Sequence, residues 1–107
     1  MEIREFALKI LSSDQLEIKV AYPPTDLTDE RPGPAERWLK PVRPPHLQFA
    51  DRRQRGKMPA PSALGDPRRR AICLHKFANH ELMALELMAF ALLAWPDMPT
   101  GFRRGLV

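Results

Sequence analysis

The chain has 107 residues, which is room for one small domain and too little for two. It carries 17 basic and 13 acidic residues, a net charge of +4, and its 44% apolar content excludes wholesale disorder. The single cysteine, Cys73, excludes an intrachain disulfide and a cysteine-built zinc site. The longest nearly apolar run, Leu82–Trp95, contains Glu86 and is shorter than the roughly 20 residues of a membrane span. Because MEIREFALKI also lacks the apolar core of a signal peptide, we expect a cytoplasmic protein without a membrane segment.

The first expected element is an amphipathic helix at the N-terminus. Its apolar residues, from Ile3 to Leu11, recur three and four positions apart and so share one helix face. Asp14, with Glu17 three residues later, predicts the cap of a second short helix. The apolar alternation over Leu16–Val20 also suits a strand, but we favour a helix because no partner strand is evident. Residues 1–20 are therefore the first of three expected segments, an N-terminal amphipathic helical one.

A proline-rich, basic arm is expected over residues 21–66. Ten of the twelve prolines lie between Pro23 and Pro67, and they prevent a continuous helix. From Arg31 to Arg70 there are 11 Lys and Arg against 3 Asp and Glu, a net charge of +8, which leaves −4 for the rest. A free linker rarely keeps apolar residues such as Trp38 and Phe49. We therefore expect the arm to lie against the helices or against a partner.

The third segment, residues 67–107, begins with the clearest element of the sequence. Asp66 is a favourable N-cap, and Pro67 suits the first helical position, where no amide is needed. The helix continues without a breaker from Arg68 to Trp95 and is then stopped by a proline. Cys73 lies in its apolar pattern, which predicts a small buried hydrophobic side chain. A further helix is expected to start at Pro99-Thr100.

One acidic residue of the long helix stands among apolar neighbours. Glu81 shares a face of the predicted helix with Leu74, Ala78, Leu85, Met88 and Leu92. Burying an unpaired carboxylate costs several kcal/mol or shifts its pKa, so a buried Glu81 needs a cation, a metal or a hydrogen-bond partner. Three interpretations are open at this point: a metal ligand, a member of a structural ion pair, or a simple exposed glutamate.

A polar stripe runs along the same helix. It consists of His75, Asn79, Met83 and Glu86, within about one quadrant of the helical wheel. This stripe predicts a polar seam against another helix, in which Asn79 could bridge to His75. His80 falls between the faces, where a lone histidine is usually structural, and we assign no role to His46. The sequence has no His-Glu-x-x-His motif, no glycine-rich phosphate loop and no Ser–His–Asp or Cys–His catalytic pattern.

These segments together resemble a ferritin-like family of bacterial proteins, domain of unknown function 455. The resemblance covers nearly the whole chain: the MEIREFALKIL opening, RPGPAERW and RPPHLQF in the arm, DPRRRAICLHKFANHELMALELMAFALLAWPD, and the MPTGFRRGLV ending. In ferritin-like proteins a segment similar to Asn-x-Glu-Leu-x-Ala places its glutamate on a di-metal site, and residues 79–84 fit it. The resemblance therefore makes Glu81 the leading metal-ligand candidate, followed by Glu86, His80 and His75.

The resemblance also implies which parts are missing. Ferritin-like bundles hold two iron or manganese ions with one Glu from each of two helices and a Glu-x-x-His pair from each of two others. This sequence has no Glu-x-x-His, because Ala84 and Ala89 stand three residues after Glu81 and Glu86. We therefore expect an all-α, partial (truncated) ferritin-like helical bundle, with one long helix and a proline-rich extended N-terminal arm. As an N-terminal fragment it should be inactive alone and hold no iron or manganese stably.

Two other functions stay open, and an enzymatic activity is neither assigned nor excluded. The long helix is apolar nearly all round, which is typical of a helical interaction or assembly module without metal. Its partners would be a second copy of the chain or missing C-terminal helices. A basic cluster, made of Arg52, Arg53, Arg55, Lys57 and Arg68–Arg70, could bind nucleic acid weakly. Phe49 is the one nearby ring for base stacking, so a solvated basic arm is the preferred interpretation.

Overall fold

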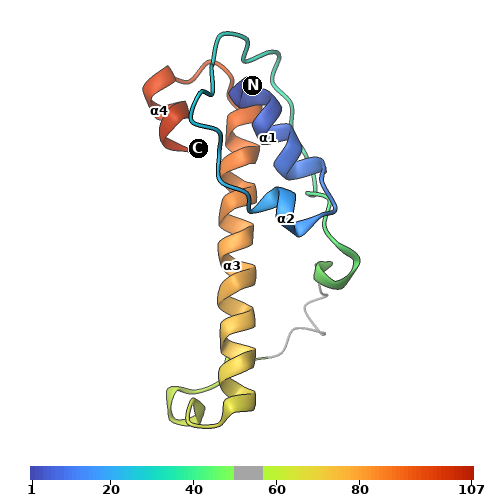
Figure 1. Cartoon of the computed structure of the whole chain (residues 1–107), viewed down its shortest axis with the longest axis vertical. Helices are drawn as coiled ribbons and strands as arrows, with labels where there is room; N and C mark the ends of the chain where they lie inside the picture. The colour runs from blue at the N-terminus through green and yellow to red at the C-terminus, as the bar shows by residue number, and fades with distance from the viewer. Residues whose placement is uncertain (50–56) are drawn as a thin grey trace.

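The computed structural model of the chain describes residues 1–49 and 57–107, and these residues form helices joined by extended segments, with no strand. The elements in chain order are α1 (Ile3–Ser12), α2 (Leu16–Lys19), the 3-10 turns η1 (Pro45–Leu47) and η2 (Pro61–Ala63), α3 (Pro67–Ala94) and α4 (Thr100–Gly105). The all-α class expected from the sequence is confirmed for the described part of the chain. Helix α3 is the axis of the molecule; α1, α2 and the first part of the arm lie beside its C-terminal half, and the end of the arm with η2 lies at its N-terminal end (Figure 1).

Helix α3 begins as the sequence predicts. The Asp66 carboxylate accepts a hydrogen bond from the Arg68 amide at 3.2 Å, and Pro67 occupies the first turn. The helix has 28 residues, about 40 Å at 1.5 Å per residue. Near its C-terminal end, the Leu92 carbonyl accepts a hydrogen bond at 2.8 Å from the buried side chain of Arg103, which belongs to α4.

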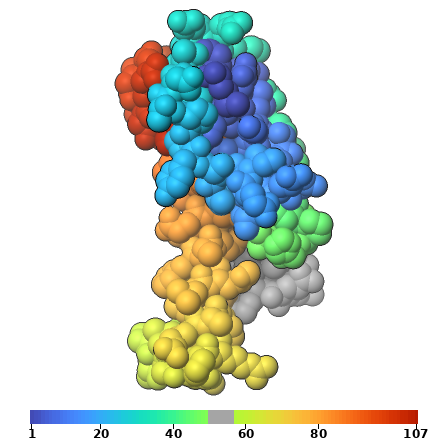
Figure 2. Space-filling view, in the orientation of Figure 1, coloured from blue at the N-terminus to red at the C-terminus, as the bar shows by residue number. Residues whose placement is uncertain are grey.

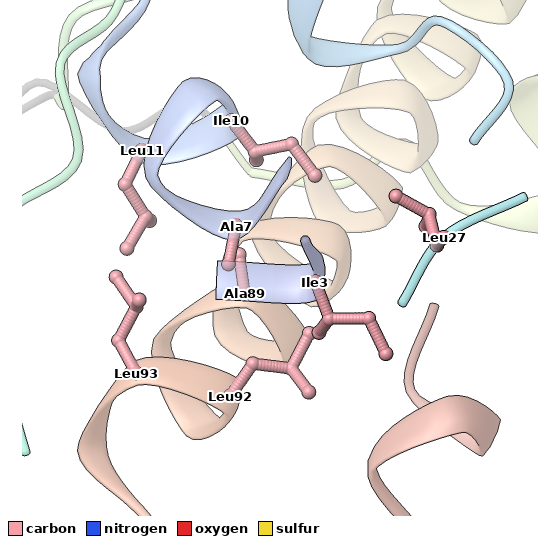
Figure 3. Packing of buried hydrophobic residues seen from close by; sticks show 8 residues of the cluster. All are labelled: Ile3, Ala7, Ile10, Leu11, Leu27, Ala89, Leu92 and Leu93. Atoms are coloured by element: carbon pink, nitrogen blue, oxygen red, sulfur yellow. The ribbon is translucent and has the colours of Figure 1, made fainter. Parts of the chain in front are cut away.

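The hydrophobic core joins α1 to the last turns of α3. It consists of Ile3, Ala7, Ile10 and Leu11 from α1, Leu27 from the arm, and Ala89, Leu92 and Leu93 from α3. These side chains point toward one another across the space between the two helices (Figure 3). Full burial of each large aliphatic side chain contributes about 1.5–3 kcal/mol. The core therefore holds α1 to one end of α3 and leaves the other end without it.

The short helix α2 is confirmed, but the expected cap is wrong. The N-cap is Gln15, which makes no side-chain capping bond, and Asp14 lies one residue before it. The reason is local, because Ser13 Oγ accepts from the Gln15 amide at 3.1 Å. This turn places the helix start one residue later than Asp14 would have done.

The arm lies against the helices along much of its described length. Its amides at Thr28, Glu36 and Val42 donate to the carbonyls of Met1, Leu93 and Leu11 at 3.1, 2.9 and 2.7 Å. An isolated parallel bridge also joins Glu2 to Thr28. The prolines prevent a helix, yet these amides still find backbone partners at Met1, on α1 and on α3. Of the two alternatives for the arm, packing on the helices is the one that the structure shows.

One bend of the arm is shaped around an arginine of α1. Arg4 Nη1 donates to the carbonyls of Pro32 and Pro34 at 3.2 and 3.0 Å, and its Nη2 pairs with the Glu36 carboxylate at 2.7 Å. Gly33, between the two prolines, has a φ of +71°, and a Cβ there would lie 2.8 Å from Arg4 Nε. Glycine is therefore required for both the backbone conformation and the close approach of the side chain.

The N-terminal part of α3 is largely uncovered. Leu74 is 67% exposed and Phe77 is 56% exposed, and the space-filling view shows this end standing clear of α1 and α2 (Figure 2). In the described part of the chain, α3 is long and apolar enough to cross a membrane, with a best 18-residue mean hydropathy of 1.3. One such helix is weak evidence for a span, because the core helix of a water-soluble protein passes the same test.

Candidate functional site

The four residues predicted as metal ligands all lie on α3, but the structure does not bring them together. His75 and Glu81 line a cavity of about 730 Å³ that α3 forms with α1 and α2. His80 and Glu86 line a second cavity, of about 440 Å³, between α3 and the arm. No three His, Cys, Asp or Glu side chains of the described residues form a group that could hold a metal ion. Their assignment as ligands stays a prediction.

Glu86 is the most strongly held of the four. Its side chain is 4% exposed, and it lies between two buried cations, Lys19 of α2 and Arg43 of the arm. Lys19 Nζ donates to Glu86 Oε2 at 3.0 Å and to the Ile10 carbonyl at 2.6 Å. Arg43 Nε donates to Glu86 Oε1 at 3.1 Å, and Arg43 Nη2 donates to the same oxygen. Both carboxylate oxygens are therefore occupied by cations, which leaves little capacity for a metal.

The polar stripe on α3 forms its seam against the arm. Arg43 Nη1 donates to Asn79 Oδ1 at 2.8 Å, and the guanidinium lies over the Phe49 ring with its carbon 4.1 Å from the centroid. Asn79 Nδ2 in turn donates weakly to Met83 Sδ at 3.8 Å. A seam against another helix was expected from the sequence, and the structure forms it with Arg43 of the arm and, at Glu86, with Lys19 of helix α2.

The sequence analysis missed both cations of this cluster. Lys19 lies within the alternating apolar residues of Leu16–Val20, one residue before their end, and its side chain is fully buried. Arg43 is one of the 11 basic residues between Arg31 and Arg70, and nothing in its immediate neighbourhood distinguishes it. The usable signal was Glu86 itself, because a carboxylate inside an apolar run needs a buried cation. Finding which cation requires the fold.

Glu81 has the opposite environment. Its side chain is exposed, and no described residue forms a hydrogen bond or an ion pair with it. The neighbours on its face of α3 are apolar and largely uncovered, including Leu74 and Met88, which are 67% and 45% exposed. Of the three interpretations, the ion pair is absent among the described residues. The structure shows an exposed glutamate, and the metal-ligand interpretation stays a prediction.

The remaining candidates are easily placed. His75 and His80 are exposed, on the walls of the first and second cavities, and His46 lines the first cavity as well. Cys73 is buried with 9% exposure, as its apolar pattern predicts.

The basic cluster proposed for nucleic acid is described only in part. Arg52, Arg53 and Arg55 lie outside the described residues. Lys57 and the three arginines Arg68–Arg70 are exposed at the N-terminal end of α3. Arg69 Nε stands 3.8 Å from the Asp66 carboxylate, a long and solvated contact. The described part of the cluster is therefore exposed, and the preference for a solvated arm over a nucleic-acid site stays a prediction.

A family model confirms the relationship that the motifs indicate. It matches residues 4–107 and is described as a protein of unknown function, DUF455. The chain belongs to the DUF455 family. No curated protein and no solved structure matches it. The family description assigns no chemistry, so the ferritin-like character of this DUF455 chain is a matter for proposal.

The two glutamates of α3 in this DUF455 chain thus differ in what they can do. Glu86 ties α2 and the arm to α3, so its carboxylate has a structural task. Glu81 stands on an open apolar face with both oxygens available to any group that approaches. Oxygen ligands of this kind suit hard divalent cations. Of these two carboxylates, Glu81 is therefore the one that the described residues leave unpaired.

Proposed function

We propose that this chain is part of a ferritin-like di-metal carboxylate protein of unknown substrate that works in the cytoplasm. In this proposal α3 is one ligand-bearing helix, Glu81 is its metal ligand, and other helices supply the Glu-x-x-His pairs. One observation carries it: a carboxylate without a partner among the described residues stands at the centre of an exposed apolar face of a long helix.

The argument follows from what must happen when that face is covered. Helices whose apolar faces are exposed are stabilised by packing against other helices. Packing would remove the Glu81 carboxylate from water, and a buried carboxylate needs a compensating cation. Glu86 already has two cations of its own, so the compensation at Glu81 must come from outside the described residues. A divalent metal shared with other carboxylates supplies it.

The described residues do not complete such a site by themselves. A di-metal bundle uses six protein ligands from four helices. The described part of this chain offers Glu81 and, on the same cavity wall, His75. We therefore expect the chain alone to bind iron or manganese weakly and to show no complete activity.

Manganese binding measured by electron paramagnetic resonance tests this role. The chain is titrated with Mn²⁺ beside Glu81→Gln and a matched control, Glu17→Gln, which changes an exposed glutamate of α2. We expect weak binding that is lost in the Glu81 variant and kept in the Glu17 variant. Equal binding in all three proteins would contradict the ligand role. Tight binding of two ions per chain would contradict the need for further helices.

The alternative is an assembly module that holds no metal. It is favoured by the extent of the uncovered face, where Leu74, Phe77 and Met88 are between 45% and 67% exposed. In that case Glu81 would be an exposed glutamate near the middle of a helix-packing surface. The manganese titration separates the two, because an assembly module has no binding that depends on Glu81.

A further inference from the structure

We propose that the far end of α3 is a docking surface for an anionic lipid membrane, on which the chain rests without crossing it. This surface, called the tip below, consists of residues 57–72, which contain the turn η2 and the first turns of α3. It lies at one end of a molecule that is 50 Å long and 26 by 22 Å across, and it stands clear of α1 and α2 (Figure 2). The inference goes beyond the proposed function, and three observations carry it.

The first observation is an uncharged loop at the tip. Residues 58–65, with the sequence MPAPSALG, contain no charged side chain, and all of them are exposed or half-buried. Met58 of this loop is 47% exposed, and Ile72, in the second turn of α3, is 46% exposed. Apolar side chains at a projecting end can enter the boundary between lipid headgroups and acyl chains, where they leave water.

The second observation is that this loop satisfies part of its own backbone. Pro59 and Pro61 have no amide that would need a partner. The amides of Ala63 and Leu64 donate to the carbonyls of Ala60 and Pro61 at 2.9 and 3.3 Å. A backbone group that leaves water without a partner raises the free energy of the bound state. The loop therefore enters a less polar layer at a lower cost than an open turn would.

The third observation is the charge beside the loop. The tip has four basic residues and one acidic residue, so it carries +3 of the net charge of +4. The basic residues are Lys57, Arg68, Arg69 and Arg70, and all four are exposed. The acidic residue, Asp66, uses its carboxylate as the N-cap of α3. Because anionic headgroups attract Lys and Arg close to the surface, the tip is the end of the molecule that faces such a membrane.

An anionic membrane fits the tip better than a nucleic acid does. Both partners attract basic residues. Single-stranded nucleic acid is also held by stacking on aromatic rings, and residues 57–72 contain no aromatic side chain. A duplex is held through its phosphates, which gain nothing from an uncharged loop. Exposed Met58 and Ile72 are instead stabilised by an apolar layer behind the negative charge.

The tip stays accessible when the proposed further helices cover the Glu81 face. Nine residues separate Ile72 from Glu81, and at about 100° per residue the two lie on opposite sides of α3. Arg68 lies one turn before Ile72 on the same side, and it is about 20 Å from Glu81 along the axis at 1.5 Å per residue. The membrane contact is therefore independent of whether Glu81 binds a metal.

Vesicle sedimentation tests the location of the contact. The full chain is mixed with vesicles of phosphatidylcholine, with and without about one third phosphatidylglycerol, at about 50 mM salt. We expect binding to the anionic vesicles only. Each basic residue removed from the tip should weaken it about fivefold, so Arg68→Gln combined with Arg70→Gln should weaken it about 25-fold. Lys9→Gln combined with Arg37→Gln, which removes the same charge from exposed residues of α1 and the arm, should change it less than about twofold. Equal losses in the two double variants, or no binding of the unmodified chain, would overturn the proposal.

Insertion of the uncharged loop is tested separately. Met58→Ser should weaken vesicle binding about fivefold, whereas Leu39→Ser, at a fully exposed leucine of the arm, should leave it unchanged. An environment-sensitive dye on Ser62→Cys, in a chain that carries Cys73→Ser, should shift to the blue when anionic vesicles are added. The same dye on Thr25→Cys, at an exposed position near α1, should not shift. An unshifted dye at position 62 on bound chain would contradict the insertion of the loop.

A nucleic-acid competitor completes the test. A DNA duplex is titrated with the same variants under the same salt. Binding of the duplex that is tighter than binding of the vesicles, and that is unaffected by Met58→Ser, would overturn the assignment of a lipid partner. All variants should keep the helical circular dichroism of the unmodified chain, because every substituted residue of the tip is exposed.

Discussion

The sharpest prediction concerns the two glutamates of α3, Glu81 and Glu86. They are five residues apart, and Glu81 is exposed whereas Glu86 is buried. Glu86→Gln keeps the shape of the side chain and removes its charge. It leaves Lys19 and Arg43, which are 0% and 1% exposed in their side chains, without a buried anion. Breaking a buried ion pair by removing one partner costs about 3–5 kcal/mol. Because a domain of this size has a total stability of about 5–15 kcal/mol, the loss is a large fraction of it.

Glu81→Gln is the matched control on the same helix. Glu81 is exposed and has no partner among the described residues, so its substitution should change the free energy of unfolding by less than about 0.5 kcal/mol. Urea unfolding followed by circular dichroism measures both variants, at low protein concentration so that self-association does not contribute. If Glu86→Gln is too unstable to analyse in water, an excluded osmolyte restores the folded baseline. Variants that differ by less than about 1 kcal/mol would refute the assignment of Glu86 as the buried anchor.

The cluster also predicts an asymmetry between its two cations. One carboxylate faces two positive charges, so Lys19→Met leaves a balanced Glu86–Arg43 pair that still includes two guanidinium nitrogens. We expect it to cost less than Glu86→Gln, because no uncompensated charge stays buried. A loss as large as that of Glu86→Gln would mean that Lys19, and not the charge balance, decides the stability.

Three further predictions concern the attachment of the arm and the start of α3. Gly33→Ala should lower the free energy of unfolding in urea by about 1–3 kcal/mol. The alanine would have to adopt a positive φ, and its Cβ would displace the Arg4 side chain. The Thr28 hydroxyl, with the amides of Arg31 and Glu30, lowers the pKa of Glu2 from its ordinary value of 4.5. Its stabilisation is therefore complete above pH 4.5 and lost as the pH falls through the lowered value, so Glu2→Gln should flatten the pH dependence of the melting temperature there. Asp66→Ala should cost about 1 kcal/mol by removing the N-cap, with a readout in the helical circular dichroism.

Helices whose signals are local were predictable from the sequence. Asp66-Pro67 marks the start of α3 because both residues act within one turn, through a side-chain acceptor and a fixed φ. The apolar spacing of α1 likewise depends on neighbours three and four residues away, and the helix is found at Ile3–Ser12. The predicted cap of α2 is wrong, because Ser13 Oγ accepts from the Gln15 amide in a local turn and the helix begins after Gln15 instead of after Asp14.

The contacts of the arm and of the candidate site could not be predicted from residues that are close in the sequence. The bond from Arg43 to Glu86 spans 43 residues and the bond from Lys19 to Glu86 spans 67, so neither pairing leaves a trace in sequence spacing. Composition showed that a buried carboxylate needs a cation but could not choose among 17 Lys and Arg side chains. The separation of Glu81 and Glu86 into different environments was visible on the helical wheel. Predicting which of the two would be covered required the positions of α2 and the arm.

The all-round apolar character of α3 has three separate causes. One side packs on α1 through Ala89 and Leu93 and is buried in the core. A second side meets the arm, and there Glu86 is charged because Arg43 and Lys19 neutralise it. The third side has apolar residues on both flanks of Glu81, and most of them, such as Leu74 and Met88, are exposed, whereas Leu85 is half-buried against the core. A helix that packed only through the first two sides would typically carry charged or polar residues on the third side, which faces water. If the proposed further helices cover this third side, they must supply a cation or a proton at Glu81, because a buried carboxylate needs compensation.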